Sequence, residues 1–195
     1  MKTVIRLLAA ALTAALLAAA PALAAGELFS FDFENGVPEA WSAGRTFDLD
    51  QGKTLGLFNS RNPKTPAATT LRLGGLPAGK PVRLTFDLVL IGSWDSEGEL
   101  ADLFSVISSK GTVLLDLTAF PCKIEGDNEE KPIGNTGLCK VPASSRLLGY
   151  WVLPQAIEIA PGEIADGRLE LTFKGVTSAR KVEFWALDNV RVSLP

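Results

Sequence analysis

The chain has 195 residues with a formal net charge of −3, and it contains no histidine. The lack of histidine excludes Ser-His-Asp and Cys-His nucleophiles and every histidine-ligated metal site. The acidic balance leaves no basic stripe, so nucleic acid is not expected to be a partner.

The first 25 residues have the pattern of a secretory signal peptide. Lys2 and Arg6 supply a positive n-region, an apolar h-region follows, and Ala22-Leu23-Ala24 is a small-residue cleavage site. A membrane anchor is the alternative, but the apolar run is short and alanine-rich, and the cleavage signal follows it at once. We therefore predict one mature domain, residues 26–195, that is secreted or periplasmic and has no membrane segment after cleavage.

Two cysteines, Cys122 and Cys139, are expected to form a disulfide, because an even pair in an exported chain reads as a structural bridge. The enclosed loop is charged and rich in glycine, and closing it would stabilise the fold by roughly 3 kcal/mol. A redox-active pair is the alternative, although the sequence has no C-x-x-C motif.

Short stretches of alternating apolar and polar residues recur along the mature chain, separated by Gly, Pro and Asn turns. The expected strands are 28–34, 41–49, 52–57, 69–73, 81–91, 102–108, 112–117, 155–159, 167–174 and 181–194. Strands 102–108 and 112–117 are expected to form a hairpin. Helical periodicity is almost absent. The pattern predicts an all-β fold, an antiparallel two-sheet β-sandwich of jelly-roll type.

The last expected strand, 181–194, contains a carboxylate in an apolar setting. Alternation places Asp188 on the same inward face as six apolar residues. These are Val182, Phe184, Ala186, Val190, Val192 and Leu194. A buried carboxylate without a partner costs several kcal/mol, so Asp188 needs one. The partner is either a bound cation, backbone N–H groups, or the side chain of Arg191 or Lys181.

Three short segments resemble known families. The segment Phe31-Asp32-Phe33-Glu34-Asn35-Gly36, with Trp41 seven residues after Glu34, is similar to the opening of MAM-type domains. The segment from Trp185 to Val192 resembles the closing strand of that group and of other jelly-roll, concanavalin-like and carbohydrate-binding modules. Gly92-Ser93-Trp94-Asp95, followed by residues 102–106, is similar to a pattern in secreted bacterial proteins of this sandwich type.

The resemblance implies a structural calcium site. In such modules the first and last strands commonly lie close together, and acidic residues from both bind Ca²⁺. Carried over to this chain, the implied ligands are Glu34 and Asp188, with Asp32 as a further possibility. Carboxylate oxygens are ligands that Ca²⁺ prefers.

A second candidate cation site is the acidic loop that holds Asp95, Glu97, Glu99 and Asp102. The loop does not match the EF-hand pattern. Its alternative interpretation is a solvated loop that keeps the strand ends soluble.

Aromatic residues are the candidate ligand-binding residues, because carbohydrate-binding modules stack sugars on exposed rings. Trp94 is in an expected loop, and Tyr150 and Trp151 are adjacent, so that one of them would point outward from a strand. The alternative is that these rings fill the core. We predict a non-catalytic module that binds an extracellular ligand, most plausibly a glycan.

Two other functions stay open. The first is a protein-binding module for adhesion or envelope assembly. The second is a small glycoside hydrolase that uses only Asp and Glu, since that chemistry needs two carboxylates at a fixed separation. The segment Asp95-Ser96-Glu97-Gly98-Glu99 has the wrong order for sandwich glucanases, which favours the non-enzyme interpretation.

Overall fold

The computed structural model describes residues 26–99, 101–121, 124–125, 131–132 and 136–195. Its elements are β1 (Glu27–Phe31), β2 (Arg45–Leu49), β3 (Gly52–Phe58), β4 (Ala68–Leu73), β5 (Val82–Gly92), β6 (Leu103–Ser108), β7 (Val113–Leu117), β8 (Ile124–Glu125), β9 (Lys131–Pro132), β10 (Gly137–Lys140), β11 (Leu147–Ile159), the 3₁₀ turn η1 (Pro161–Glu163), β12 (Leu169–Val176) and β13 (Glu183–Ser193). Within the described residues no helix is long and apolar enough to cross a membrane. The predicted signal peptide lies outside them.

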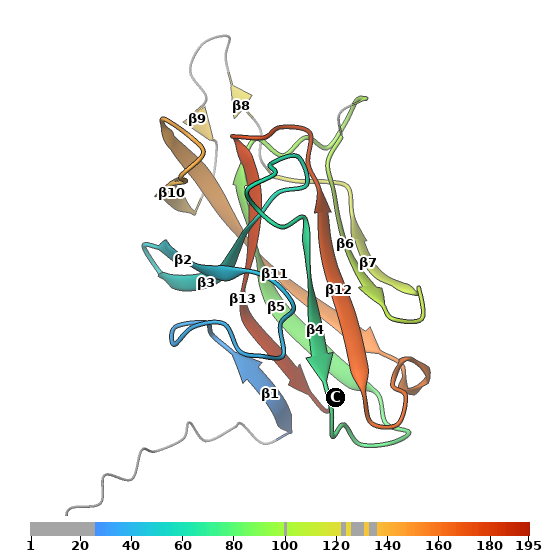
Figure 1. Cartoon of the computed structure of the whole chain (residues 1–195). Coiled ribbons are helices and arrows are strands. Elements are labelled where there is room, and N and C mark those ends of the chain that lie inside the picture. Colours follow the sequence, from blue (N-terminus) through green and yellow to red (C-terminus); the bar gives the residue numbers. More distant parts are fainter. Residues whose placement is uncertain (1–25, 100, 122–123, 126–130, 133–135) are drawn as a thin grey trace, which may run out of the picture.

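Most of the strands form two antiparallel sheets that face each other (Figure 1), and β8 and β9 form a separate two-stranded sheet. The larger sheet has the order β10-β11-β5-β13-β3-β2, and β1 pairs with the second half of β13. The smaller sheet has the order β4-β12-β6-β7, and β6 and β7 form the predicted hairpin. The predicted all-β, antiparallel two-sheet β-sandwich is confirmed.

The main core lies between the two sheets and is rich in aromatic rings. Alternation on β12 turns Leu169, Leu171 and Phe173 inward, and all three are buried. The ring of Phe173 packs against that of Phe86 on β5, with centroids 5.4 Å apart. The ring of Trp185 on β13 stacks at 4.2 Å on Phe58 of β3. Residues from both sheets therefore share one core.

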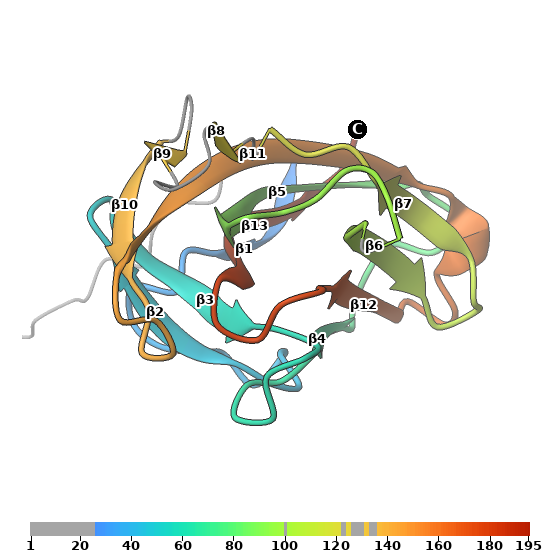
Figure 2. The same ribbon diagram turned by 90° about the horizontal axis from the view of Figure 1, so that it is seen from above.

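A second apolar cluster covers the outer face of the larger sheet. Its members are Leu57, Val89, Ile91, Cys139, Val141, Leu148, Tyr150, Phe184 and Ala186. Strands β5 and β13 are consequently buried on both faces. Seen from above, β2 and β10 lie at the same end of the molecule, where the larger sheet curls (Figure 2). We call this curled outer face, with the second cluster as its floor, the concave face.

A β-bulge in β13 changes which side chains face the main core. Asp188 is opposite Asp87, but the next paired residue is Arg191, and Asn189 has a positive φ of 48°. Residues before the bulge and after it are therefore out of phase. Val190 and Val192 face the main core, whereas Phe184 and Ala186 belong to the concave face. The prediction that these four residues share one face with Asp188 is wrong for this reason.

Strand β11 begins eight residues before the predicted strand at 155–159. The first half was not predicted because its apolar and polar residues do not alternate. Tyr150 belongs to the second cluster and Trp151 to the main core, so both faces of this segment are apolar. Pro154 lies within the strand. It is tolerated because β10 pairs only with residues Leu147 to Tyr150, which leaves β11 at the sheet edge beyond that point among the described strands.

Candidate functional site

Three carboxylates converge at one end of the sandwich. Asp95 follows β5, Asp102 precedes β6, and Glu183 begins β13. One ligand oxygen from each lies within 4.8 Å of those of the other two. Asp102 and Glu183 are each only 2% exposed, whereas Asp95 is exposed. We call these residues the acidic triad.

Backbone N–H groups hold the two buried carboxylates of the triad in place. Asp102 accepts hydrogen bonds from the Asp95 N–H at 2.7 Å and from the Ser178 N–H at 2.9 Å. Glu183 accepts from the N–H groups of Ser178 at 2.7 Å and Ala179 at 2.6 Å. The Asp95 carboxylate accepts no hydrogen bond from the described residues. Backbone N–H groups of the surrounding loops thus hold Asp102 and Glu183, whereas the exposed Asp95 carboxylate has no such hydrogen bond from the described residues.

Burial makes ionisation of the triad unfavourable. Loss of solvent raises the pKa of Asp102 from 3.8 to about 7, and the charges of Glu183 and Asp95 add to that effect. Burial also raises the pKa of Glu183, and the Asp95 charge contributes in the same direction. Among the described residues no Lys or Arg forms an ion pair with any of the three. Either bound protons or a bound cation must therefore compensate this negative charge.

The donor set of the triad fits a hard divalent cation. It offers only oxygen atoms, and Ca²⁺ takes oxygen ligands from carboxylates and carbonyls. Each oxygen of Asp102 accepts one N–H and keeps a second lone pair that can contact an ion. Oε2 of Glu183 accepts two N–H groups, so Oε1, which accepts the Ser178 hydroxyl at 3.0 Å, is the Glu183 oxygen with a lone pair left for an ion. The triad therefore provides at most part of a Ca²⁺ coordination shell, and water or carbonyl oxygens would have to complete it.

Two of the three triad residues were predicted from the sequence. Asp95 and Asp102 were among the four residues of the predicted acidic-loop site, and the structure brings them together. Glu97 and Glu99 are exposed and lie outside the triad. Glu183 was missed. Its one sequence signal was a charged residue between Val182 and Phe184 in an apolar strand.

The predicted calcium ligands Asp188, Glu34 and Asp32 lie near one another on the concave face side of the sheet. Burial raises the pKa of Asp188 to about 6, and the charges of Asp87, Glu34 and Asp32 contribute. The Asp188 carboxylate accepts a hydrogen bond from the Asn189 N–H at 2.7 Å, which is the backbone alternative to a metal. Among the described residues, these carboxylates do not form a group of three within 4.8 Å. A cation here stays a prediction.

The predicted aromatic stacking platform is wrong. Trp94 donates from Nε1 to the Phe184 carbonyl at 3.0 Å and is buried. The Tyr150 hydroxyl donates to the Asp50 carboxylate, and the Trp151 ring packs in the main core. Trp94 is 1% exposed, Tyr150 0% and Trp151 4%, so neighbouring residues cover all three rings. None of them presents a face on which a sugar could stack.

Cys139 is buried, and in its reduced form burial raises the pKa of its thiol to about 12. Its predicted partner, Cys122, lies outside the described residues, so the disulfide stays a prediction. We expect protein from the native compartment to gain two hydrogens in mass upon reduction. Alkylation after unfolding should modify both cysteines only when reductant is present. Two alkylated cysteines without reductant would contradict the disulfide.

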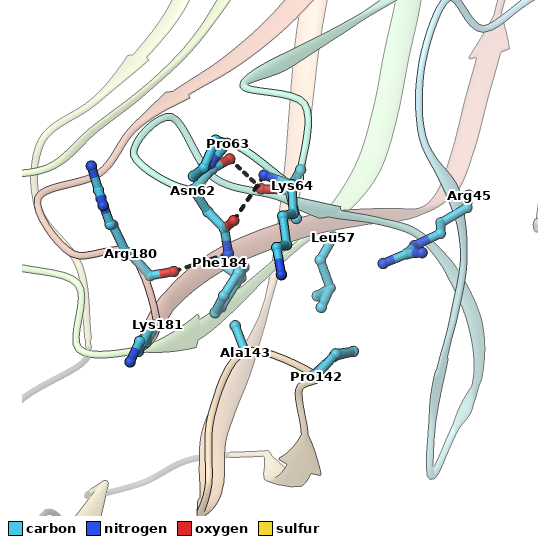
Figure 3. A pocket seen from close by; sticks show the side chains of 11 residues that line it. Arg45, Leu57, Asn62, Pro63, Lys64, Pro142, Ala143, Arg180, Lys181 and Phe184 are labelled. Atoms are coloured by element: carbon cyan, nitrogen blue, oxygen red, sulfur yellow. Dashed lines mark hydrogen bonds between the residues drawn. The ribbon is translucent and has the colours of Figure 1, made fainter.

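A pocket with a volume of about 450 Å³ opens on the concave face. Its floor is formed by Leu57 of β3 and Phe184 of β13, and Pro142 and Ala143 close it from the β10–β11 loop (Figure 3). The remaining lining residues are Arg45, Asn62, Pro63, Lys64, Thr65, Arg180 and Lys181. The volume is in the range of small-molecule sites. We call it the basic pocket.

Local hydrogen bonds shape the basic pocket. The Asn62 side chain donates to the Arg180 carbonyl at 3.1 Å and accepts from the Lys64 N–H at 3.0 Å, so it ties the β3–β4 loop to the loop before β13. Asn59 anchors the same β3–β4 loop by accepting from the N–H groups of Arg61 and Asn62, each at 2.7 Å. The pocket walls are therefore held by specific bonds.

The basic pocket has no acid–base pair for glycoside hydrolysis. That chemistry needs two carboxylates on either side of the scissile bond. No Asp or Glu is among the described residues that line the pocket. The triad does hold carboxylates close together, but two of its members are buried and hydrogen-bonded to backbone.

No protein-family model matches the sequence, and no curated protein matches it. Three solved structures have a similar arrangement of strands. The K3 cleaved adhesin domain of Lys-gingipain from Porphyromonas gingivalis is 15% identical, with a TM-score of 0.49, over 86% of this chain and 99% of that chain. The CBM22-1 xylan-binding domain from Paenibacillus barcinonensis is 14% identical, with a TM-score of 0.41, over 89% and 97%.

The third structure is CBM27-1 from Caldicellulosiruptor saccharolyticus in complex with mannohexaose. It is 14% identical, with a TM-score of 0.41, over 84% of this chain and 96% of that chain. At these identities and TM-scores, none of the three likenesses indicates what this chain binds.

Proposed function

We propose that the protein is an exported, non-catalytic β-sandwich module that binds a glycan in the basic pocket. The observation that carries the proposal is the composition of that pocket, an apolar floor surrounded by hydrogen-bond donors. A sugar ring has apolar C–H faces and a rim of hydroxyl groups, so it matches such a lining. The lack of lining carboxylates supports a binding role over hydrolysis.

The distribution of exposed apolar residues favours a small ligand over a protein partner. The large exposed apolar side chains of the described residues are Val113, Leu138, Leu147 and Val176. Val113 and Val176 lie on β7 and β12, which do not pair with each other, whereas Leu138 and Leu147 are diagonal neighbours on the paired strands β10 and β11. At most two of the four are therefore adjacent. A protein-binding face would be expected to gather such residues into one patch.

We further propose that the acidic triad binds a structural Ca²⁺. The support is the closeness of its three carboxylates and the burial of two of them without an ion-pair partner among the described residues. The ion would join the loops around Asp95, Asp102 and Glu183, which come from separate parts of the chain. Its role would be to stabilise the end of the sandwich, not to carry out a reaction.

The glycan proposal predicts that filling the basic pocket abolishes binding. Ala143→Leu adds neutral bulk at a half-buried lining position, so a ligand found by glycan-array screening should bind at least tenfold more weakly. Isothermal titration calorimetry measures the change. Val113→Leu, on the exposed face of β7, is the control and should bind normally. Unchanged affinity in folded Ala143→Leu protein would place the binding site elsewhere.

A further inference from the structure

Positive charge gathers at the basic pocket although the protein as a whole is acidic. Arg45, Lys64, Arg180 and Lys181 all line it, and all four are exposed. They come from three separate segments: the start of β2, the β3–β4 loop and the loop before β13. The fold therefore assembles this cluster from positions that are far apart in sequence.

The four basic side chains of the pocket have no carboxylate partner among the described residues, unlike several arginines elsewhere on the surface. Arg72, Arg83 and Arg191 form ion pairs with Glu170, Glu158 and Glu27. In the described part of the chain, none of the four pocket cations pairs with a carboxylate. Their charge is therefore available to a ligand.

The four side chains are not equally placed. In Figure 3 the side chains of Arg45 and Lys64 reach toward the floor residues Leu57 and Phe184, whereas the Arg180 side chain extends away from them. A smaller hollow of about 170 Å³ adjoins the pocket and shares Arg45, Leu57, Lys64 and Thr65 with it. Arg45 and Lys64 therefore lie where the two hollows meet.

We propose that the basic pocket binds an acidic glycan, whose carboxylate or sulfate groups contact Arg45 and Lys64. This inference rests on the proposed function, since it names the class of glycan that the same pocket accepts. A guanidinium binds carboxylate and sulfate through two parallel hydrogen bonds, and an ammonium adds a compact charge. The C–H face of the sugar ring would lie on Leu57 and Phe184.

Charge elsewhere on the concave face supports an anion at this end. Asp87 and Asp188 line a separate small hollow of about 80 Å³, together with Tyr150 of the second cluster. An anionic ligand is repelled from those carboxylates and attracted to the basic pocket. The concave face therefore carries negative charge around Asp87 and Asp188 and positive charge around Arg45 and Lys64, and an anion would bind at the positive end.

The test is calorimetric titration of the purified mature protein with three oligosaccharides of matched length: neutral galactan, oligogalacturonate and sulfated galactan. We expect an acidic one to bind and the neutral one to bind at least tenfold more weakly. Lys64→Met and Arg45→Met keep the side-chain length but remove the charge, so each should weaken binding about tenfold. Raising the salt from 50 to 500 mM should weaken it further.

The control is Lys174→Met on β12, an exposed lysine of the smaller sheet, which should leave affinity unchanged. Preference for the uronide or for the sulfated sugar identifies the anion. A different outcome is that neutral galactan binds as tightly as the acidic sugars, the two methionine variants bind normally and Ala143→Leu loses binding. That result would contradict the acidic ligand but support glycan binding in the basic pocket. If no glycan binds, both proposals fail. Binding of polyglutamate alone would instead indicate an acidic protein partner.

Discussion

In EDTA, the free energy of unfolding is expected to fall as the pH rises from about 4 to about 7. The pKa of Asp102 is 3.8 in an unfolded chain and about 7 in the folded protein. Between these values the folded state binds more protons than the unfolded state, so raising the pH favours unfolding. One pKa unit corresponds to about 1.4 kcal/mol, so the expected loss is at most on the order of a few kcal/mol.

The other described carboxylates with a shifted pKa do not reverse this trend in that window. Asp188 acts in the same direction, because its pKa is also raised, to about 6. Glu163 acts in the opposite direction, because hydrogen bonds from Ser108 and Thr112 lower its pKa. The stability that Glu163 contributes is present above its ordinary pKa of 4.5 and is lost only at lower pH. Urea unfolding at several pH values, followed by tryptophan fluorescence, measures the slope.

Calcium is expected to remove most of this pH dependence. A cation binds the ionised triad, so at pH 7.5 a hundredfold excess over the dissociation constant should add about 2.7 kcal/mol to the free energy of unfolding. If Ca²⁺ has no effect while the pH slope persists, the triad is compensated by a proton and the proposed calcium site is wrong.

The Asp95→Asn variant tests whether a cation or a proton compensates the charge of the triad, because the change in its free energy of unfolding should have opposite signs in EDTA and in Ca²⁺. The Asp95 carboxylate accepts no hydrogen bond from the described residues, so the substitution removes charge without breaking a bond. In EDTA at pH 7.5 the variant should be more stable than the wild type, because repulsion of Asp102 and Glu183 is relieved. In Ca²⁺ it should be less stable, because a ligand is lost. Glu97→Gln, an exposed neighbour outside the triad, should change neither value.

Gly92→Ala is expected to destabilise the protein by about 3–4 kcal/mol. Gly92 has a φ of 89°, where an alanine is strained. A Cβ at this position would also overlap the carbonyl oxygen of Val182, which accepts the Ser93 N–H. The end of β5 would then have to move away from β13, and Glu183, which pairs with Gly92, would move with it. The variant should therefore also respond less to Ca²⁺.

Gly75→Ala provides the matched control for that loss. Gly75 has a similar φ of 78°, but no atom lies within 4 Å of a Cβ built there. It should lose only the cost of the backbone conformation, roughly 1–2 kcal/mol. Urea unfolding of the two variants side by side measures the difference. Equal losses would mean that the close approach of Gly92 and Val182 does not contribute.

The strands could be predicted where one face meets the core and the other meets solvent. β12 has that alternation and was predicted near its observed bounds. The β6–β7 hairpin was predicted near its bounds from the two short apolar runs on either side of Ser109-Lys110-Gly111. The first half of β11 was missed because it is apolar on both sides. The bulge at Asn189 was missed because one extra residue leaves no mark in the pattern, yet it reverses the phase of everything after it.

The two candidate sites were harder to predict because long-range pairing creates them. Glu183 reaches Asp102 only through the pairing of β13 with β5, and their separation in sequence hides the relation. The cations of the basic pocket are isolated in sequence and look like ordinary surface residues. Trp94 suggested an exposed platform because it follows a strand, but its indole N–H binds the Phe184 carbonyl beneath the loop.

Pro154 has a consequence for how the molecules behave in concentrated solution. It lies in the part of β11 that has no neighbouring strand on one side among the described strands. An open strand edge with free N–H and C=O groups can pair with the same edge of another molecule and start aggregation. Proline has no N–H to offer, so it interrupts the row of donors that such pairing needs. We therefore expect Pro154 to hinder pairing of this edge with a second molecule.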